Sequence, residues 1–171
     1  MKKQLLTFFL LALLIPVVAN AYSVYKIDGI YYYFSGNEAI VTNSVYGNPY
    51  PDDPYVGSVV IPDSVTWYGR TYPVTTIGLQ AFSNSTELTS IDIPPTVTKC
   101  EFSAFASSWG LQRVNIHDMA AWLKITFGND WANPLFRGDY LYLNGELVTD
   151  VDVPSSITEI KNFAFSGCRS L

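Results

Sequence analysis

The chain contains few of the residues that carry metal and nucleophilic chemistry: two cysteines and one histidine among 171 residues. Zinc sites draw their ligands from cysteine, histidine and acidic residues, and the single histidine, His117, has no second nitrogen ligand. A hydrolytic enzyme would need a nucleophile–base pair or paired carboxylates in a cleft, and no spacing specifies either. We therefore expect no catalytic residue, no metal and no cofactor.

Positive charge is also scarce. The chain has ten lysines and arginines against fifteen acidic residues. It shows neither the basic footprint of a nucleic-acid-binding protein nor a polybasic segment for anionic lipid. We therefore expect no nucleic-acid partner.

Long apolar runs are confined to the N-terminus. Lys2 and Lys3 precede an apolar run from Leu5 to Val18, and "ANA" at 19–21 fits a cleavage site. The run is shorter than the ~20 residues of a transmembrane helix, so it predicts a secretory signal peptide over residues 1–21. The mature chain would start at Tyr22 with eight basic and fifteen acidic residues, a net charge of −7, and no membrane span. We expect it to be exported, either secreted or held at the cell surface.

Three segments of the remaining chain repeat in register. "AFSNSTELTSIDIP" at 81–94 matches "AFASSWGLQRVNI" at 104–116 with an offset of 23 residues, and "VPSSITEIKNFAFSGCRSL" at 153–171 keeps the internal spacings. The unit reads L-x-x-[IV]-x-[IV]-P-x-x-V-T-x-I-x-x-x-A-F. It opens with the alternation of a half-buried strand, which the proline then ends. Because one unit cannot bury its own apolar face, we expect stacked units that share one core.

Several of these segments resemble the BspA-like leucine-rich repeats of bacterial secreted and surface proteins, among them "VVIPDSV", "IGLQAF", "LTSIDIPPTVT" and "ITEIKNFAFSGCRSL". The resemblance implies a leucine-rich-repeat solenoid of the α/β horseshoe type, mostly β, over residues 59–171. "SVYKIDGIYYYF" resembles the N-terminal capping region of such proteins, so residues 22–58 are expected to form a β-hairpin cap. A non-enzymatic, protein-interacting module is implied, with an unspecified ligand on a host or bacterial surface.

The register also assigns a role to the cysteines. Cys100 lies five residues before Phe105, at the inward position that Ile77 and Ile160 occupy in other units. A free cysteine there behaves as a small buried hydrophobe. Cys168 is in another phase and about two units away, beyond the Cα distance of about 7 Å that a disulfide allows. We predict two free thiols, although an accessible Cys100 close to His117 would revive a catalytic reading.

Two insertions interrupt the array, near residues 67–75 and 118–148. The first, "WYGRTYPVT", reads as a β-hairpin. The second begins with a short helix that Asp118 can cap and ends with a hairpin at Asn144-Gly145, a strong type I′ signal. A third hairpin of this kind is predicted at Asp28-Gly29.

Polar positions between the inward apolar residues are expected to face solvent on the sheet and to form a protein-contact surface. The alternative is a solvated face without a specific partner. These positions are Thr89, Ser90, Asp92, Gln112, Arg113, Asn115, Asp150 and Asp152.

Exposed aromatic side chains are the second group of candidate contacts. Trp67, Tyr68 and Tyr72 lie in the first insertion, and inserted loops of repeat proteins often gather on the binding face. Core packing is the alternative role for each of them. The second hypothesis is a carbohydrate-binding module that stacks sugars on exposed rings, and it predicts that Trp67, Tyr68, Trp109 or Trp131 line an exposed patch. By the register, Leu171 opens a further strand, so we expect the array to be truncated at its C-terminus.

Overall fold

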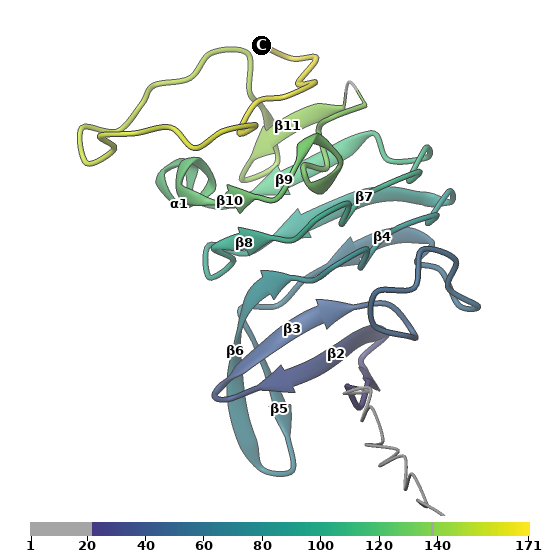
Figure 1. Cartoon of the computed structure of the whole chain (residues 1–171). Coiled ribbons are helices and arrows are strands. Elements are labelled where there is room, and N and C mark those ends of the chain that lie inside the picture. The colour runs from purple at the N-terminus through teal and green to yellow at the C-terminus, as the bar shows by residue number, and fades with distance from the viewer. Residues whose placement is uncertain (1–21, 138) are drawn as a thin grey trace, which may run out of the picture.

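Two β-sheets run along the molecule, and successive segments of the chain contribute strands to each in turn (Figure 1). The structure, a computed structural model, describes residues 22–137 and 139–171; the signal peptide predicted over residues 1–21 lies outside the described residues. Among the described residues, none of the helices has the length and apolar character that a bilayer span requires.

The first sheet, sheet A, contains the strands nearest the N-terminus and the shorter strands of the repeats. Its order is β1 (Tyr25–Ile27), β2 (Ile30–Ser35), β3 (Glu38–Thr42), β6 (Arg70–Ile77), β8 (Lys99–Cys100) and β10 (Thr126–Phe127), with β5 (Ser64–Trp67) paired to β6. The second sheet, sheet B, has the order β12 (Glu146–Leu147), β11 (Tyr140–Leu143), β9 (Arg113–Ile116), β7 (Leu88–Ile93) and β4 (Gly57–Val60). The helices are α1 (Met119–Lys124) and a 3₁₀ turn at Asp130–Ala132.

The predicted repeat register is confirmed where β7 meets β9. The two strands are parallel, with Ile91 opposite Val114 and Ile93 opposite Ile116, and all four side chains are buried. In sheet A the parallel pairing of β8 with β6 sets Cys100 opposite Ile77. The core therefore lies between the sheets, and it is filled by rows of equivalent residues from neighbouring units.

The "AF" corner between the two sheets also repeats. Phe82 and Phe105 stack with ring centroids 5.0 Å apart and planes 2° from parallel. Left-handed backbone recurs at the same places in two units, at Gln80 and Asn84 and again at Ser103 and Ser107. The repeat thus fixes the backbone path of the corner as well as its core residue.

Antiparallel strands β1–β3 extend sheet A at its N-terminal end, where β3 pairs in parallel with β6 and Val41 lies opposite Ile77. The hairpins predicted at Asp28-Gly29 and Tyr68-Gly69 are both confirmed, with positive φ at both central residues. That geometry matches the right-handed twist of the flanking strands. Figure 1 shows β2 and β3 at the end of the stack.

The stretch predicted as an insertion over residues 118–148 needs a correction. The short helix and its Asp118 cap are confirmed, since the Asp118 carboxylate accepts a hydrogen bond from the backbone of Ala121. However, β11 supplies the next strand of sheet B, and Leu143 lies opposite Ile116. The repeat register assigned that place to Val153, the first residue of the third repeated segment. The stretch is a divergent repeat unit of its own.

The same observation removes two predicted residues from the sheet. Asp150 and Asp152 lie outside it, because the Asn144-Gly145 turn reverses the chain and β12 pairs antiparallel with the free edge of β11. Residues 148–171 are all described and contain no strand. Ile160, which the register equates with Cys100, is consequently 45% exposed.

The cysteine predictions hold. Both thiols are free, and Cys100 is fully buried, so burial raises the pKa of its thiol. A buried thiol with a raised pKa supplies little thiolate. Cys100 is therefore a core residue, and the catalytic reading that depended on its accessibility loses its support.

Candidate functional site

The outer face of sheet B brings together side chains from four parallel strands. Along each strand, alternate residues point away from the core, which gives two rows across the sheet. One row contains Ser58, Ser90, Arg113 and Tyr140, and the other contains Val60, Asp92, Asn115 and Tyr142. Four of the predicted contact residues therefore share one face.

Two further predicted residues border this face. Thr89 and Gln112 are exposed at equivalent places in neighbouring units, and the backbone N–H of Gln112 donates to the carbonyl of Thr89 at 3.0 Å. Tyr140 donates in turn to the carbonyl of Gln112 at 3.1 Å. Both side chains thus remain available beside the sheet.

Asn115 is the exception among the predicted contacts, because it is only 8% exposed. Its Nδ2 donates to Asp92 Oδ2 at 2.6 Å, and its Oδ1 accepts from the backbone of Gly145 at 2.8 Å. Both polar atoms of its side chain hold neighbouring strands in register, so the side chain has little hydrogen-bonding capacity left for a binding partner. Buried amides of this kind are usually satisfied within the protein.

His117 completes this polar network. Its Nε2 lies 2.5 Å from Asp92 Oδ1 and its Nδ1 lies 3.1 Å from Asn144 Oδ1. The hydrogen bond to Asp92 raises the pKa of His117 above its usual value. His117 therefore links the β11–β12 turn to β7, whereas its neighbour Asp118 caps α1.

A groove of about 640 Å³ opens beside β9 and β11 at one end of this face. We call it the arginine groove. It is lined by Trp109, Leu111, Gln112, Arg113, Arg137, Asp139, Tyr140, Tyr142 and Arg169.

Three of the chain's four arginines line this groove, and each faces an aromatic ring. Their guanidinium carbons lie 3.7 Å from the ring centroid of Tyr142 for Arg113, 3.7 Å from that of Trp109 for Arg137, and 6.0 Å from that of Tyr140 for Arg169. Cation–π attraction of this kind holds a guanidinium over a ring face.

Asp139 is the groove's one acidic residue, and it is 6% exposed. Burial raises the pKa of its carboxyl to about 6, although the positive charges of Arg169 and Arg137 act in the opposite direction. Desolvation disfavours the charged form of an acid. The carboxyl of Asp139 therefore stays protonated to a higher pH than that of a solvated aspartate, although two arginines are close to it.

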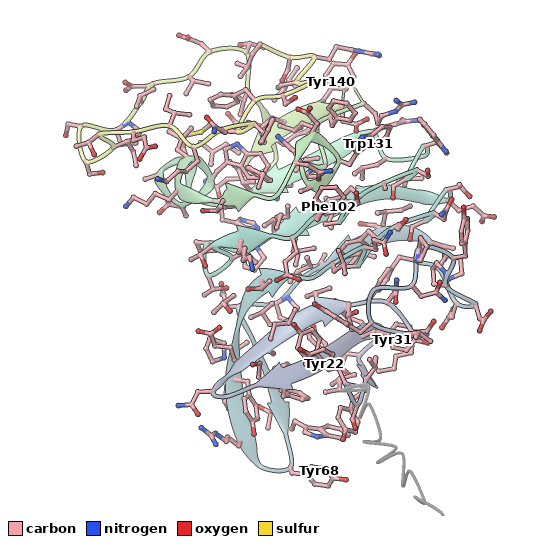
Figure 2. The ribbon with its side chains drawn as sticks, viewed as in Figure 1. Tyr22, Tyr31, Tyr68, Phe102, Trp131 and Tyr140 are labelled. Carbon is pink, nitrogen blue, oxygen red and sulfur yellow. The ribbon has the colours of Figure 1, made fainter. Side chains whose placement is uncertain are left out.

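The predicted aromatic contacts divide into packed and exposed residues. Trp67 packs on Tyr25 and Phe34 with ring centroids 4.6 Å and 6.2 Å away, and Tyr72 packs on Phe34 at 4.7 Å. Tyr68 is 90% exposed at the tip of the β5–β6 hairpin (Figure 2). It lies at the opposite end of the molecule from the groove residue Tyr140, so the two do not form one surface.

Sequence reasoning missed most of the arginine groove. The sequence identified Gln112 and Arg113, and Trp109 for the carbohydrate alternative. It did not identify Arg137, Asp139, Tyr140, Tyr142 and Arg169. A signal was present in "DYLYL", whose alternating apolar residues read as a strand, but the assumed 23-residue period excluded it. In residues 22–137 and 139–171, no group of three histidine, cysteine or acidic side chains is placed to hold a metal ion.

Two solved structures with similar chains are bacterial proteins described as leucine-rich. A leucine-rich repeat protein from Bacteroides capillosus is 26% identical, with a TM-score of 0.43 over 58% of this chain and 74% of that one. A leucine-rich cell surface protein from Faecalibacterium prausnitzii is 25% identical, with a TM-score of 0.48 over 87% of this chain and 41% of that one. This chain thus spans less than half the length of the second protein. No curated protein matches the chain.

A family model identifies the repeats directly. The model of the BspA type leucine-rich repeat region matches residues 58–127 and 137–171, in six copies. The first match begins within β4 and the second resumes just before β11, in agreement with the repeat units of the structure. Since the matched residues make up more than half of the sequence, this chain belongs to the BspA type leucine-rich repeat family.

Proposed function

We propose that this protein is an exported, non-enzymatic interaction module that binds a protein partner through the outer face of sheet B. Family membership and the likeness to a cell surface protein support export, as does the predicted signal peptide. The observation that carries the proposal is the alignment of exposed and half-buried polar and aromatic side chains on four parallel strands. A rigid sheet presents such side chains at little entropic cost on binding.

The face suits a protein partner because it offers several kinds of contact. Tyr140 and Tyr142 are amphipathic, Arg113 carries charge, and Ser90 donates and accepts hydrogen bonds. Tyrosine and arginine are enriched where protein interfaces concentrate their binding energy. We further propose that β1–β3 cap the stack, since Ala39 and Val41 are buried against β6.

A binding screen tests the proposal. The purified chain would be measured against immobilised extracellular-matrix proteins, plasma proteins and polysaccharides. Tyr142→Ala removes a ring from the outer face, and Tyr68→Ala removes an exposed ring from the distant hairpin as a matched control. Saturable binding to a protein that weakens about tenfold with Tyr142→Ala alone would support the proposal. Binding that is confined to polysaccharides would contradict it.

The carbohydrate alternative keeps one observation in its favour, the exposure of Tyr68 and Trp109 at 90% and 52%. A sugar would stack on a free ring face, but the guanidinium of Arg137 already lies over Trp109. Trp67, which this alternative also used, packs within the protein. Polysaccharide binding that depends on Tyr68 and not on Tyr142 would favour the alternative.

A further inference from the structure

We propose that the arginine groove binds side-chain carboxylates of an acidic peptide segment. The inference rests on the proposed function, because such a segment would belong to the protein partner, and it names the chemistry that the partner presents. Figure 2 shows the groove residue Tyr140 and the neighbouring Trp131 at the same end of the molecule.

The distribution of charge is the first observation. The chain from Tyr22 onward carries a net charge of −7, yet three of its four arginines line one groove that contains a single acidic residue. A local positive patch on an acidic protein attracts and orients negatively charged partners. The rest of the surface would repel them, so an acidic segment is directed toward this groove.

The scarcity of internal polar partners for the groove arginines is the second observation. Within residues 22–137 and 139–171, the ion pairs use Lys26, Lys99, Lys161 and His117, and none uses an arginine. Arg113 donates one hydrogen bond of 3.3 Å to the carbonyl of Gly145. The cationic groups of the groove therefore keep most of their hydrogen-bonding capacity for a ligand.

The geometry of the guanidinium groups is the third observation. A guanidinium that stacks on a ring still has the N–H groups at its edge available for an in-plane acceptor. Carboxylates match this edge with two parallel hydrogen bonds. Because aromatic rings hold Arg113 and Arg137 at 3.7 Å, less side-chain entropy is lost when a carboxylate binds.

Two competing anions fit less well. A phosphate ester carries up to two negative charges, and it would meet stronger repulsion from Asp139 when that acid is ionised. An acidic sugar would need a ring face for stacking, and Arg137 covers a face of Trp109. A peptide with several singly charged carboxylates spreads its charge over the three arginines, so each carboxylate meets less repulsion from Asp139 than a doubly charged phosphate would, and it needs no free ring face.

The test is a titration of the full purified chain with blocked ten-residue peptides, followed by calorimetry and by tryptophan fluorescence. The probe alternates glutamate with serine, and the reference peptide replaces every glutamate with glutamine. A phosphoserine peptide and polygalacturonate are tested in parallel. The variants are Arg137→Gln and Arg169→Gln, with Arg70→Gln as the matched control. Arg70 is suitable because it also lies over a tyrosine, at 5.0 Å from the centroid of Tyr72, but belongs to the distant hairpin.

We expect saturable binding of the glutamate peptide that is at least tenfold tighter than that of the glutamine peptide. Each groove variant should weaken it by about tenfold, as expected for one charge-assisted contact, and Arg70→Gln should leave it unchanged. Asp139→Asn should strengthen it at pH 7. Circular dichroism confirms that each variant is folded.

Three results would overturn the inference: equal binding of both peptides, no saturation at millimolar glutamate peptide, or tighter binding of the phosphopeptide or polygalacturonate. The protein screen separates this failure from that of the proposed function. A partner that binds through Tyr142, and that the glutamate peptide does not displace, would leave the proposed function standing without the carboxylate site.

Discussion

Two regions of this protein carry the same repeat motif but differ in structure. In the units of β7 and β9, the motif forms strands and its apolar residues are buried; Phe82 and Phe105 are 0% and 4% exposed. In residues 148–171 the same spacings form no strand, and Val153 and Ile160 are 40% and 45% exposed. The motif therefore specifies which residues can be buried, and a neighbouring unit decides whether they are.

Hydrogen bonds supplement the limited core packing of the second region, in which Ala164 is buried and Ile157 and Phe165 are half-buried against the core. Trp122 Nε1 donates to the carbonyl of Ala164 at 3.1 Å, and the backbone N–H of Arg169 donates to the carbonyl of Asp139 at 3.0 Å. Gly167 is confined by the preceding unit, since an added Cβ would lie 2.4 Å from the carbonyl oxygen of Phe136. The segment is thus docked on the last strand-forming unit without extending its sheets.

The largest expected difference between the regions is in core truncation. Phe82→Ala should destabilise the fold by about 3–5 kcal/mol, because it leaves a cavity between Tyr55 and Phe105. Phe165→Ala, at the equivalent place in the last region, should cost about 1 kcal/mol. Urea denaturation of both variants measures the difference. Equal losses would show that the last region is packed as tightly as the others.

Asp139, at the junction of the two regions, should produce a dependence of stability on pH. Its pKa is raised from 3.8 to about 6, so the folded state favours the protonated acid, and stability should fall as the pH rises from about 4 to about 6. Asp139→Asn should therefore stabilise the protein by about 2–3 kcal/mol at pH 7 and have no effect below about pH 4. Thermal denaturation across this range measures it; a destabilised variant at pH 7 would mean that the carboxylate is well solvated or paired.

The two cysteines allow the same substitution to be compared in the two regions. Cys100→Ser should destabilise the protein by about 1–3 kcal/mol, because it places a hydroxyl in an apolar core, whereas Cys168→Ser should change stability by less than about 0.5 kcal/mol. A thiol reagent should label Cys168 in the native protein and Cys100 only after unfolding. Rapid labelling of both would contradict the burial of Cys100.

The smallest expected effect concerns His117. Its pKa should lie above 6.5 and should fall toward that value in Asp92→Asn. An exposed pair of this kind contributes about 0.2–1 kcal/mol. The stabilisation is fully present below pH 6.5 and is lost as the pH rises through the folded-state pKa of His117. Because this is the chain's one histidine, its proton resonance gives the titration directly by NMR. If the pKa of His117 were unchanged in Asp92→Asn, the hydrogen bond to Asp92 would not be the cause of the raised pKa.

The sequence by itself determined the repeat register of β7 and β9, the positions of the three hairpin turns, the Asp118 cap and the burial of Cys100. Each depends on residues close together in the chain, or on a spacing that recurs along it. Local backbone preference and apolar periodicity are sufficient for features of this kind.

Only the tertiary structure decided which segment follows β9 in sheet B and which residues share the arginine groove. The divergent unit contains an α-helix and a 3₁₀ turn, so Leu143 lies 27 residues after Ile116 and a fixed period could not locate it. Arg113, Arg137 and Arg169 are distant in sequence, and the stacking of units brings them to one groove. Burial and strand pairing depend on which segment of the chain packs beside a given strand. For this unit, the local sequence pattern did not identify that segment.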